Sequence, residues 1–540
     1  MQREKRICIL YSALLLCLWL LCVKLYLLSS GQDNKALTVL DGQYSSRLVI
    51  AQRSGFIYDR YFELLSHDEC TGILTVNPSE ITNLQEVSLE ISKNTPNFAQ
   101  SEILEKIHVG SPFKVTVKDN NSAIRLCKKY SGLYYTAAFD ENNSLARHFL
   151  GYSRENKGIT GLRGYYSTFL YNKLSSQSDV VFTRNAINQS MSPLKINDRS
   201  YNSTDGIITT LDKKLQTFCD SLEADIKSGC VVVADSENGE ILALSSFPSY
   251  DVQNLSLYLD SQKGELLNRV LYSYTPGSIF KIIVSAAALE KDSGYIDFTH
   301  TCSGSIQADD HVLKCHLSQG HGTLSMKDAF ALSCNCYYVA LAKEIGLKKI
   351  VETAKITGLD KASQADFLKE ATHSFPDFEN LSDGYLANIS IGQGDLCVSP
   401  LDMINVMICA VTGYRTFPRA ILGAVQNGKG IYTEPPVKTR VFSKNTADLL
   451  CNMMEECVNT GTGKSGKIED VRMGGKTATA QTGRFDPNGV EYVHKWFCGY
   501  YEGIGKTYIF CILCDNTPEN KLSPAVVSGK LCSFLKENMY

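Results

Sequence analysis

The sequence predicts an α+β fold from about residue 205 onward, with one mostly antiparallel sheet and helices packed on it. Two observations support this prediction. Five strand-like runs flank a long, largely helical stretch that begins near Ser278 and ends near Met454. The first two runs are joined by Asp-Ser-Glu-Asn-Gly, which is a hairpin signal. The five runs lie at residues 230–234, 240–246, 472–481, 493–501 and 507–514.

Helices are expected on both sides of this strand set. Residues 207–212 lead into a predicted helix that ends near residue 226, and a last helix is expected over residues 526–537. Five strands, two early and three late, would then enclose a helical insertion.

Length and composition limit the class of protein. With 540 residues, the chain is longer than one ordinary domain. A hydrophobic fraction of 44% and a charged fraction of 21% suit a folded protein with a large core. The formal net charge is −3 and the basic residues form no stripe, so we do not expect nucleic acid as a partner.

The amino-terminal segment is typical of a membrane anchor. Arg3, Lys5 and Arg6 precede an uncharged run from residue 7 to residue 23, and apolar residues continue to Leu28. This length is enough to cross a bilayer, and the preceding basic residues predict a cytoplasmic amino terminus with the rest of the chain outside. A cleaved signal peptide is the alternative. The run is long for such a peptide and no small-x-small site follows, which favours a retained, single-pass anchor.

The predicted organisation therefore has four parts. They are a cytoplasmic tail at residues 1–6, a transmembrane helix at 7–28, a mixed strand-and-helix domain at 29–203 and the α+β domain at 204–540. The mixed domain contains no dense cluster of candidate catalytic groups, so we interpret it as a scaffold.

The nineteen cysteines do not form a recognisable framework. Three lie in the anchor, and the odd total and irregular spacing argue against a full set of disulfides. No Cys/His set has the usual zinc spacing, so we expect neither a metal nor a cofactor. One bridge, Cys302–Cys315, is predicted because it would close a short loop.

The strongest candidate for chemistry is the segment from Tyr274 to Glu290. Pro276 and Gly277 mark a turn that leads into an apolar helical run. Ser278 and Lys281 are three residues apart, so they share one face of a helix. A buried lysine with a lowered pKa can take the proton of a serine hydroxyl and make it a nucleophile.

Two further signals follow in order. Ser333 and Asn335 place two polar groups at the approach to an apolar helix. Residues 473–480, Met-Gly-Gly-Lys-Thr-Ala-Thr-Ala, form a flat strand that exposes Lys476 and Thr477 along its edge. A flat strand beside a nucleophile suits the docking of an extended peptide through main-chain hydrogen bonds.

Together these signals resemble the S-x-x-K, S-x-N and K-T-G motifs of penicillin-binding proteins and serine β-lactamases. Segments around them match the same family, namely residues 209–212, 239–243, 276–277, 320–322, 391–394 and 496–499. Residues 53–60 and 148–151 resemble the pedestal of the class B, monofunctional type. The resemblance covers nearly the whole chain beyond the anchor. It implies a five-stranded sheet with helices on both faces, a helical subdomain and an elongated pedestal.

The resemblance also implies a peptidoglycan D,D-transpeptidase. Ser278 would attack the carbonyl of a D-Ala-D-Ala stem terminus, with Lys281 as the base. Ser333 would relay a proton, and Asn335 would bond the acyl chain and fix Lys281. β-Lactams are the implied covalent inhibitors, and a membrane-embedded glycosyltransferase is the implied partner.

The remaining roles fall on the late strand. Lys476 and Thr477 would hold the terminal carboxylate of the substrate. Backbone N–H groups of Ser278 and Thr479 would form the oxyanion hole. The third position of the K-T-G motif is Ala478, and the effect of its methyl group depends on whether it points at the substrate or at the core.

Three other classes of protein share some of these motifs: a silent scaffold, a penicillin-binding sensor and a β-lactamase. A catalytically weak or silent scaffold of a wall-synthesis complex is motivated by Ala478. A penicillin-binding sensor would need a larger cytoplasmic part than the six residues before the anchor. Glu265-Leu-Leu-Asn268 spells the E-x-x-L-N motif of class A β-lactamases, but it precedes Ser278, and we expect it to be part of a structural helix.

Overall fold

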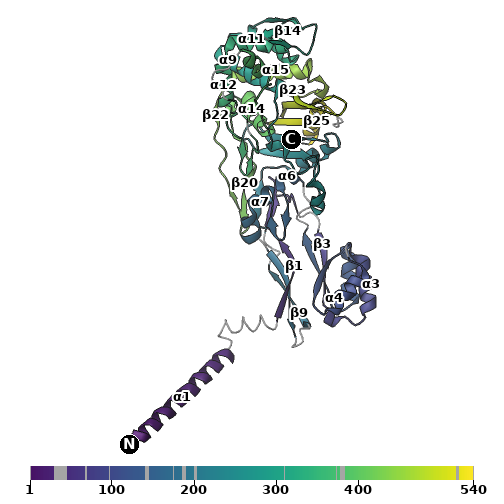
Figure 1. Ribbon diagram of the computed structural model, residues 1–540, viewed down its shortest axis with the longest axis vertical. Coiled ribbons are helices and arrows are strands. Elements are labelled where there is room, and N and C mark those ends of the chain that lie inside the picture. The colour runs from purple at the N-terminus through teal and green to yellow at the C-terminus, as the bar shows by residue number, and fades with distance from the viewer. Residues whose placement is uncertain are drawn as a thin grey trace. The chain divides into compact units, whose positions relative to one another are not determined.

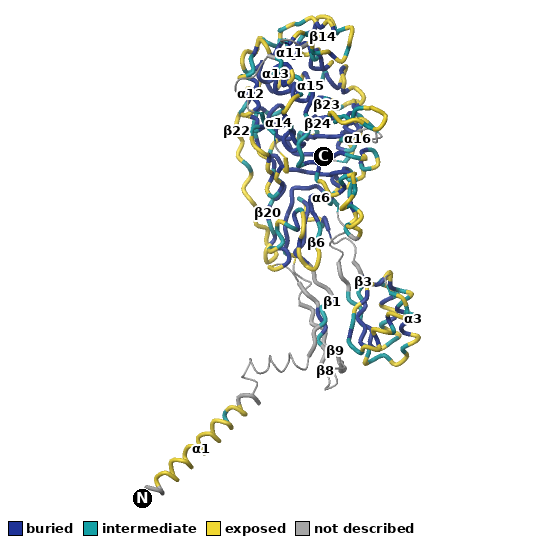
Figure 2. Tube along the Cα trace, in the orientation of Figure 1, coloured by how far each residue is buried: buried dark blue, intermediate teal, exposed yellow. Residues whose placement is uncertain are grey.

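The structure is a computed structural model of the whole chain. It describes residues 2–29, 45–66, 70–96, 98–139, 145–173, 176–184, 190–199, 204–308, 311–372, 374–376, 383–517 and 522–538. Helix α1 spans Gln2–Ser29, and its segment Lys5–Tyr26 is long and apolar enough to cross a membrane. Most of the helix is coloured as exposed in Figure 2, and its apolar residues Leu10 and Leu14 are 71% and 65% exposed.

The chain divides into two compact units, and α1 belongs to the first. The first comprises residues 1–53, 69–140 and 175–202, and the second comprises residues 54–68, 141–174 and 203–540. Two stretches of the predicted pedestal, 54–68 and 141–174, therefore group with the second unit. The predicted boundary at residue 203 lies outside the described residues and stays a prediction.

The first unit contains two small antiparallel sheets, with the orders β1-β8-β9 and β4-β3-β5. Val87 and Ile91 on one helix and Ile103 and Ile107 on the next are four residues apart, so each helix turns one apolar face to a shared core with Leu74. The elements are β1 (Ser45–Arg53), β3 (Cys70–Val76), α3 (Leu84–Asn94), α4 (Gln100–His108), β4 (Phe113–Thr116), α5 (Asn120–Lys129), β5 (Leu133–Phe139), β8 (Ser176–Arg184) and β9 (Ser190–Arg199).

The second unit is organised around a five-stranded antiparallel sheet with the order β12-β11-β25-β24-β23. All five strands coincide with predicted runs, and the hairpin joins the first two. The predicted α+β fold is confirmed. The strands are β11 (Gly229–Asp235), β12 (Ile241–Phe247), β23 (Arg472–Phe485), β24 (Glu491–Gly503) and β25 (Lys506–Thr517).

The sheet is covered on both faces, which explains why β11 is buried along its whole length. Val231 and Val233 pack in a core with helices α8 (Lys213–Ser221) and α16 (Pro524–Asn538). Val232 and Ala234 point to the other face, into a core shared with α9 (Lys281–Lys291) and α14 (Pro400–Thr412). In Figure 2 the chain around the labels β23 and β24 is mostly coloured as buried.

The helical insertion between β12 and β23 carries most of the remaining elements. Helices α9, α11, α12 and α15 lie together beside the sheet (Figure 1). Its principal elements are η6 (Gly277–Phe280), α10 (Met326–Ala331), α11 (Asn335–Ile345), α12 (Leu347–Ile356), α13 (Asp383–Ser390) and α15 (Lys444–Asn459). Four short strands form two ribbons near α11: β13 (His300–Cys302) pairs with β16 (Gly322–Leu324), and β14 (Ser305–Ala308) pairs with β15 (His311–Lys314).

A small four-stranded sheet joins the start of the second unit to its helical part. Its order is β2-β10-β20-β21, and β2 pairs with β10 in parallel. The strands are β2 (Phe56–Tyr58), β10 (Gly206–Thr209), β20 (Ile421–Gln426) and β21 (Lys429–Tyr432).

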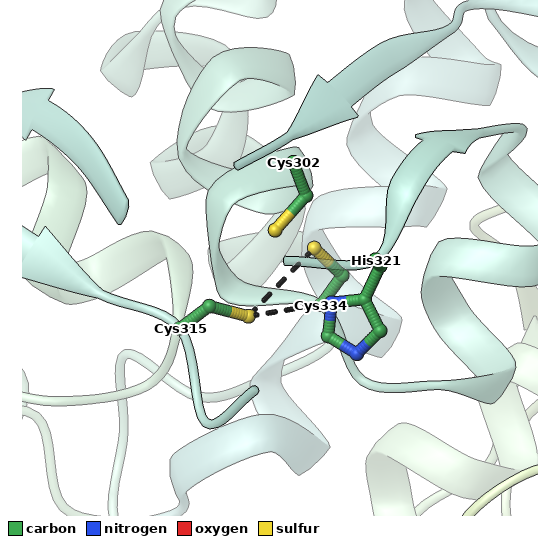
Figure 3. A group of neighbouring side chains, drawn as sticks. All are labelled: Cys302, Cys315, His321 and Cys334. Carbon is green, nitrogen blue, oxygen red and sulfur yellow. Dashed lines mark hydrogen bonds between the residues drawn. The ribbon is translucent and has the colours of Figure 1, made fainter. Parts of the chain in front are cut away.

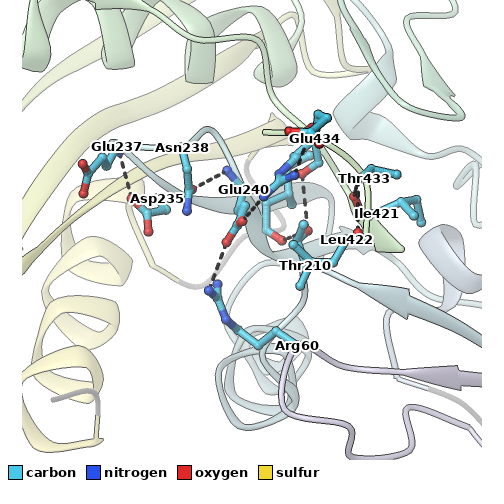
Figure 4. A network of polar contacts seen from close by, with 12 residues as sticks. Arg60, Thr210, Asp235, Glu237, Asn238, Glu240, Ile421, Leu422, Thr433 and Glu434 are labelled. Atoms are coloured by element: carbon cyan, nitrogen blue, oxygen red, sulfur yellow. Dashed lines mark hydrogen bonds and ion pairs between the residues drawn. The ribbon is translucent and has the colours of Figure 1, made fainter. Parts of the chain in front are cut away.

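An ion-pair network lies beside this small sheet (Figure 4). The carboxylate of Glu240 is only 4% exposed and lies between two guanidinium groups. Its Oε2 is 3.0 Å from Arg60 Nη2, and its Oε1 is 2.5 Å from Arg419 Nη2. Thr210 Oγ1 donates to the carbonyl of Ile241, the next residue along the chain from Glu240, at 2.5 Å. Three distant segments are held together by one buried carboxylate.

Two local predictions are wrong. Residues 265–266 form a turn and residues 267–268 have no regular structure before the short 3-10 turn Arg269–Leu271, so they are not a helix, because Gly264 has φ +66° and Asn268 accepts a hydrogen bond from Val270 N. The predicted Cys302–Cys315 bridge is absent, since both residues are free thiols.

Candidate active site

Ser278 lies on the short 3-10 turn η6, immediately before helix α9. Gly277 before it has φ +55°, a conformation that favours glycine, and its N–H donates to the carbonyl of Gly392 at 2.9 Å. A side chain at Gly277 would meet the Cβ atoms of Ala480 and Ala478 at 3.3 and 3.4 Å. The turn that presents Ser278 is therefore pressed against strand β23.

Lys281 opens helix α9 and is completely buried. Its Nζ donates to the carbonyl of Ser333 and to Asn335 Oδ1, both at 2.8 Å, and to Ser333 Oγ at 3.3 Å. The same Nζ lies 5.3 Å from the ring centroid of Tyr338. The structure thus joins the first two predicted motifs through one ammonium group.

The S-x-N segment forms the tight connection between α10 and α11. Ser333 has φ +57°, which is strained for a residue with a side chain, and it is 8% exposed. The N–H of Cys334 donates to the carbonyl of Ala329 at 2.9 Å, which closes the turn. Asn335 is the first residue of α11. This geometry aims the Ser333 carbonyl and the Asn335 amide at the same lysine.

Lys476 lies on β23 and is also completely buried, so the prediction that its side chain is exposed along the strand edge is wrong. Its Nζ donates to the carbonyl of Thr477 at 2.9 Å and lies 5.7 Å from the ring centroid of Phe330, at the end of α10. Thr477 Oγ1 is 2.5 Å from Thr462 Oγ1. Side-chain contacts thus link β23 to both the S-x-N turn and the loop that precedes the strand.

Strand β23 is an edge strand, because it ends the order of the five-stranded sheet. Thr479 is exposed and Thr477 is partly exposed, and they alternate with the buried Lys476, Ala478 and Ala480. An edge strand has one row of main-chain groups without a strand partner. This edge is available for pairing with an extended peptide.

Ala478 points into the core. Its side chain is 6% exposed, and its Cβ faces Gly277 under the turn that carries Ser278. The methyl group that departs from the K-T-G pattern therefore packs against the serine turn, not toward solvent.

The electrostatics of the site are dominated by two buried cations. Burial lowers the pKa of Lys281 well below its ordinary value, and the nearby positive charge of Lys476 lowers it further. Burial also lowers the pKa of Lys476. Among the described residues, no ion pair joins either lysine to a carboxylate. A lysine in this setting gives up its proton easily and can act as a base.

The structure therefore brings together the three predicted segments. Lys281 donates hydrogen bonds to Ser333 and Asn335. Ser278 lies one turn before Lys281, and Lys476 is close enough to lower the pKa of Lys281. Sequence reasoning missed the contacts that complete the arrangement, made by Phe330, Tyr338 and Thr462. The first two flank the S-x-N motif within five residues, but nothing in an apolar run marks which aromatic ring will face a lysine.

Comparison with known proteins gives a consistent picture. The family model of the penicillin binding protein transpeptidase domain matches residues 229–529. Stage V sporulation protein D of Bacillus subtilis is 26% identical over 474 residues, which cover 83% of this chain and 72% of that protein.

Two further similarities extend this result. Peptidoglycan D,D-transpeptidase MrdA of Acinetobacter baumannii is 26% identical over 298 residues, which cover 50% of this chain and 44% of that protein. A chain from a solved peptidoglycan synthase complex has the same fold, with a TM-score of 0.69, 19% identity and 99% of both chains covered. The last similarity concerns the fold alone.

Proposed function

Because this chain belongs to the penicillin-binding protein transpeptidase family, we propose that it is a peptidoglycan D,D-transpeptidase that works through a serine acyl-enzyme. The observation that carries the proposal is the buried Lys281, held by Ser333 and Asn335 one turn from Ser278 and without a carboxylate partner among the described residues. A lysine so placed has the lowered pKa that a base for a serine hydroxyl needs.

Acylation begins when neutral Lys281 takes the proton of the Ser278 hydroxyl. The oxygen of Ser278 then forms a bond to the carbonyl carbon between the two D-Ala residues of a stem peptide. The backbone N–H groups of Ser278 and Thr479 hold the resulting oxyanion, and each such donor is worth about 3 kcal/mol in comparable sites. When the C–N bond breaks, Ser333 passes a proton to the departing amine, and D-Ala leaves.

The second half of the reaction reverses these roles. The amine of a neighbouring stem peptide attacks the ester on Ser278, and its proton returns through the Ser333 and Lys281 pair. A new peptide bond forms and Ser278 regains its proton, so the products are one cross-link and one free D-Ala.

The edge of β23 supports the proposed docking of the donor peptide in extended form. The hydroxyl of Thr477 would donate a hydrogen bond to the terminal carboxylate. The positive charge of Lys476, on the buried face of the strand, would attract the same carboxylate. The amide of Asn335 would bond the acyl chain while it holds Lys281. β-Lactams would acylate Ser278 in the same way.

We also propose how the enzyme is oriented in the membrane and which partner it works with. Basic residues Arg3, Lys5 and Arg6 before the anchor favour a cytoplasmic amino terminus and an extracytoplasmic catalytic domain at residues 204–540. Residues 29–203 would form the pedestal between anchor and catalytic domain. A membrane-embedded glycosyltransferase would supply the uncross-linked glycan, since a transpeptidase needs newly made strands as its substrate.

An exchange assay tests this function. The full chain in detergent micelles is mixed with a synthetic stem peptide that ends in D-Ala-D-Ala and with a fluorescent D-amino acid as acceptor. We expect release of D-Ala together with a fluorescent peptide product, and neither from Ser278→Ala. Release of D-Ala without the fluorescent product would indicate a hydrolase, and no release by folded protein would indicate the silent scaffold.

A further inference from the structure

Two buried carboxyl groups belong to the network that holds residues 271–278, which we call the serine segment. Asp402 lies in the first turn of α14 and is 1% exposed, and Glu370 directly follows the short strand β18 (Leu368–Lys369) and is 6% exposed. Ser363 joins the two, since its Oγ donates to Asp402 Oδ1 at 2.5 Å and its N–H donates to Glu370 Oε2 at 3.0 Å. The mechanism proposed above uses neither carboxyl group.

The remaining carboxyl oxygens connect the pair to the start of α14 and to the serine segment. Asp402 Oδ2 accepts a hydrogen bond from Ser399 N at 2.8 Å, which forms part of the capping box of α14. Glu370 Oε1 accepts a hydrogen bond from Ser273 Oγ at 2.9 Å. Because Ser273 lies only five residues before Ser278, the carboxyl pair reaches the segment that carries the nucleophile.

Main-chain hydrogen bonds hold the serine segment to two flanking stretches. In the first stretch, the N–H of Ala371 donates to the carbonyl of Leu271 at 2.7 Å. In the second, Tyr274 and Val398 exchange two main-chain hydrogen bonds of 2.9 Å each. The first stretch directly follows one carboxyl group, and the second directly precedes the cap of α14. The carboxyl pair therefore ties both stretches to each other and to the serine segment.

A proton relieves the charge repulsion between the two carboxyl groups. An ionised carboxylate only accepts hydrogen bonds, yet the side chains of Asp402 and Glu370 hydrogen-bond to each other, which requires a proton between them. Burial and the charge of Glu370 raise the pKa of Asp402 to about 7. Among the described residues, no lysine or arginine forms an ion pair with Asp402. The proton, not a nearby cation, therefore compensates the charge of this carboxyl group.

Other charged side chains near the pair have partners of their own or face solvent. The segments that flank the pair contain six further charged residues, which are Arg269, Asp360, Lys361, Asp366, Lys369 and Asp395. Arg269 pairs with Asp515 at 3.3 Å, Asp366 accepts hydrogen bonds from two main-chain N–H groups at the start of β20, and the other four are exposed or partly exposed. Arg415, on a short strand that contacts α14, donates to the carbonyl of Ile356 at 3.0 Å.

We propose that Asp402 and Glu370 share one proton and that the protonated pair positions the serine segment for acylation of Ser278. This inference rests on the proposed function, because it concerns the same nucleophile. Both carboxyl groups act through Ser273 and the main chain, so they are positioning residues. When the proton is lost, two like charges remain in one buried site, and their repulsion draws Glu370 away from Ser273 and loosens the serine segment.

The pH dependence of a rate ratio tests the proposal. The rate of acylation by fluorescent penicillin is measured for the full chain in detergent micelles, as wild type and as Asp402→Asn. The asparagine is uncharged and has the same shape, and its amide can accept from Ser399 N while it donates to Glu370. Both proteins keep Lys281, so the titration of this lysine cancels in the ratio. The Asp402→Asn rate divided by the wild-type rate should be near one at low pH and should rise about tenfold as the pH passes about 7.

Chemical denaturation gives a second readout that does not depend on catalysis. The folded protein holds the proton of Asp402 to a higher pH than the unfolded chain, because the pKa of this carboxyl group is raised from 3.8 to about 7. The wild-type unfolding free energy should therefore fall, relative to that of Asp402→Asn, as the pH rises from about 4 to about 7, and it should stay lower above that range.

Asp212→Asn is the matched control for this substitution. Asp212 is 4% exposed and also bonds a main-chain N–H at a helix start, since it accepts from Leu215 N at 2.9 Å in α8. Among the described contacts, no second carboxyl group hydrogen-bonds to Asp212. The ratio of its acylation rate to that of wild type should therefore not change with pH. Glu370→Gln should repeat the result of Asp402→Asn, and it supplies the ratio if Asp402→Asn does not fold.

The outcomes separate the carboxyl pair from the enzyme. Ser278→Ala should take no label at any pH, and a folded wild-type protein without label on Ser278 would contradict the proposed function itself. A wild-type protein labelled on Ser278, together with a rate ratio that stays constant with pH for folded Asp402→Asn or Glu370→Gln, would overturn only the positioning role. An equal pH dependence for Asp212→Asn would overturn it as well.

Discussion

Buried charge is handled in opposite ways in two regions of the second unit. At the small sheet, Glu240 lies between Arg60 and Arg419, so charges of both signs meet at distances of 3.0 and 2.5 Å. At the serine turn, Lys281 and Lys476 are fully buried, and their described hydrogen-bond acceptors are carbonyl, amide and hydroxyl oxygens. One region pairs charges of opposite sign, and the other places two lysines close together without a carboxylate partner among the described residues.

The first arrangement stabilises the fold, and the second gives a lysine the lowered pKa that catalysis needs. A carboxylate between two guanidinium groups stays ionised and ties segments together, but removal of one partner leaves buried charge without compensation. A buried lysine without a counter-ion instead has a lowered pKa, which costs stability and prepares it as a base. Mutations at the small sheet should therefore lower stability and spare acylation, whereas mutations at the serine turn should slow acylation and affect stability less.

The largest effect is expected at Lys281. Lys281→Met removes the proposed base but keeps the apolar volume, so acylation by fluorescent penicillin should slow by about 10²- to 10⁴-fold. The unfolding free energy should fall only by the loss of the hydrogen bonds to Ser333 and Asn335, because no ion pair involves this lysine among the described residues. Acylation rates and chemical denaturation curves measure the two quantities.

The matched control for this substitution is Lys291→Met on the same helix. Lys291 is exposed, and its Nζ donates to carbonyls at the end of α11. It should acylate at the wild-type rate. A Lys281→Met protein that folds and still acylates normally would remove Lys281 from the mechanism.

Glu240 should show the reverse pattern. Glu240→Gln leaves Arg60 and Arg419 without their shared counter-ion, so we expect a loss of about 3 kcal/mol in unfolding free energy. Acylation of the folded fraction should stay within a few-fold of wild type. Denaturant titration and penicillin labelling at low temperature measure the two effects.

An exposed pair in the same network provides the control. Glu237 is 81% exposed and lies 3.5 Å from Lys438 Nζ, so Glu237→Gln should cost less than about 1 kcal/mol. Equal losses from both substitutions would contradict the contrast between paired and unpaired charge.

The pH dependence of acylation should sharpen the comparison further. The base must be neutral to act, so the acylation rate should rise with pH through the pKa of Lys281, which burial and the charge of Lys476 place below its ordinary value. Lys476→Met removes that charge, so the pKa of Lys281 should rise and the whole profile should move to higher pH. The readout is the pH at which the profile rises, not its maximum rate, since Lys476 is also proposed to bind the substrate. A profile that stays in place or moves to lower pH would exclude this coupling.

The smallest effect is expected at Ala478. Ala478→Gly restores the usual motif but removes a buried methyl group beside Gly277, so it should cost about 1 kcal/mol of stability. Acylation should change by less than tenfold, because the methyl group points away from the exposed face. Ala480→Gly is the matched control on the same face and should cost about as much. An acylation gain of tenfold or more for Ala478→Gly alone would show that its methyl group obstructs the substrate.

The sequence predicted the parts of this protein that depend on local pattern. All five strands of the main sheet were placed because their apolar runs are bounded by turn signals, and Ser278 and Lys281 were paired because their spacing fits one helix face. The prediction failed where contacts between distant residues or an unusual backbone angle determine the local structure. The non-helical structure of residues 265–268 follows from a positive φ at Gly264 that no periodicity reveals.

Contacts between distant segments also explain why the ion pairs of Glu240 and the group of Cys302, Cys315, His321 and Cys334 were not predicted. Glu240 meets Arg60 and Arg419 across about 180 residues on each side, and its role follows from the pairing of β2, β10 and β20. The prediction of a Cys302–Cys315 bridge rests on their closeness in sequence. The side chains of His321 and Cys334 also lie within 4.8 Å of these two thiols (Figure 3). Sequence spacing identifies motifs on one element, but it does not identify sites built from several loops.

Mass spectrometry of the full chain after reaction with benzylpenicillin, followed by peptide mapping, tests the central assignment most directly. The assignment predicts one covalent adduct, on the peptide that contains Ser278, and no adduct on a folded Ser278→Ala protein. An adduct on Ser333 or any other residue, or a folded wild-type protein that takes up no penicillin, would contradict it.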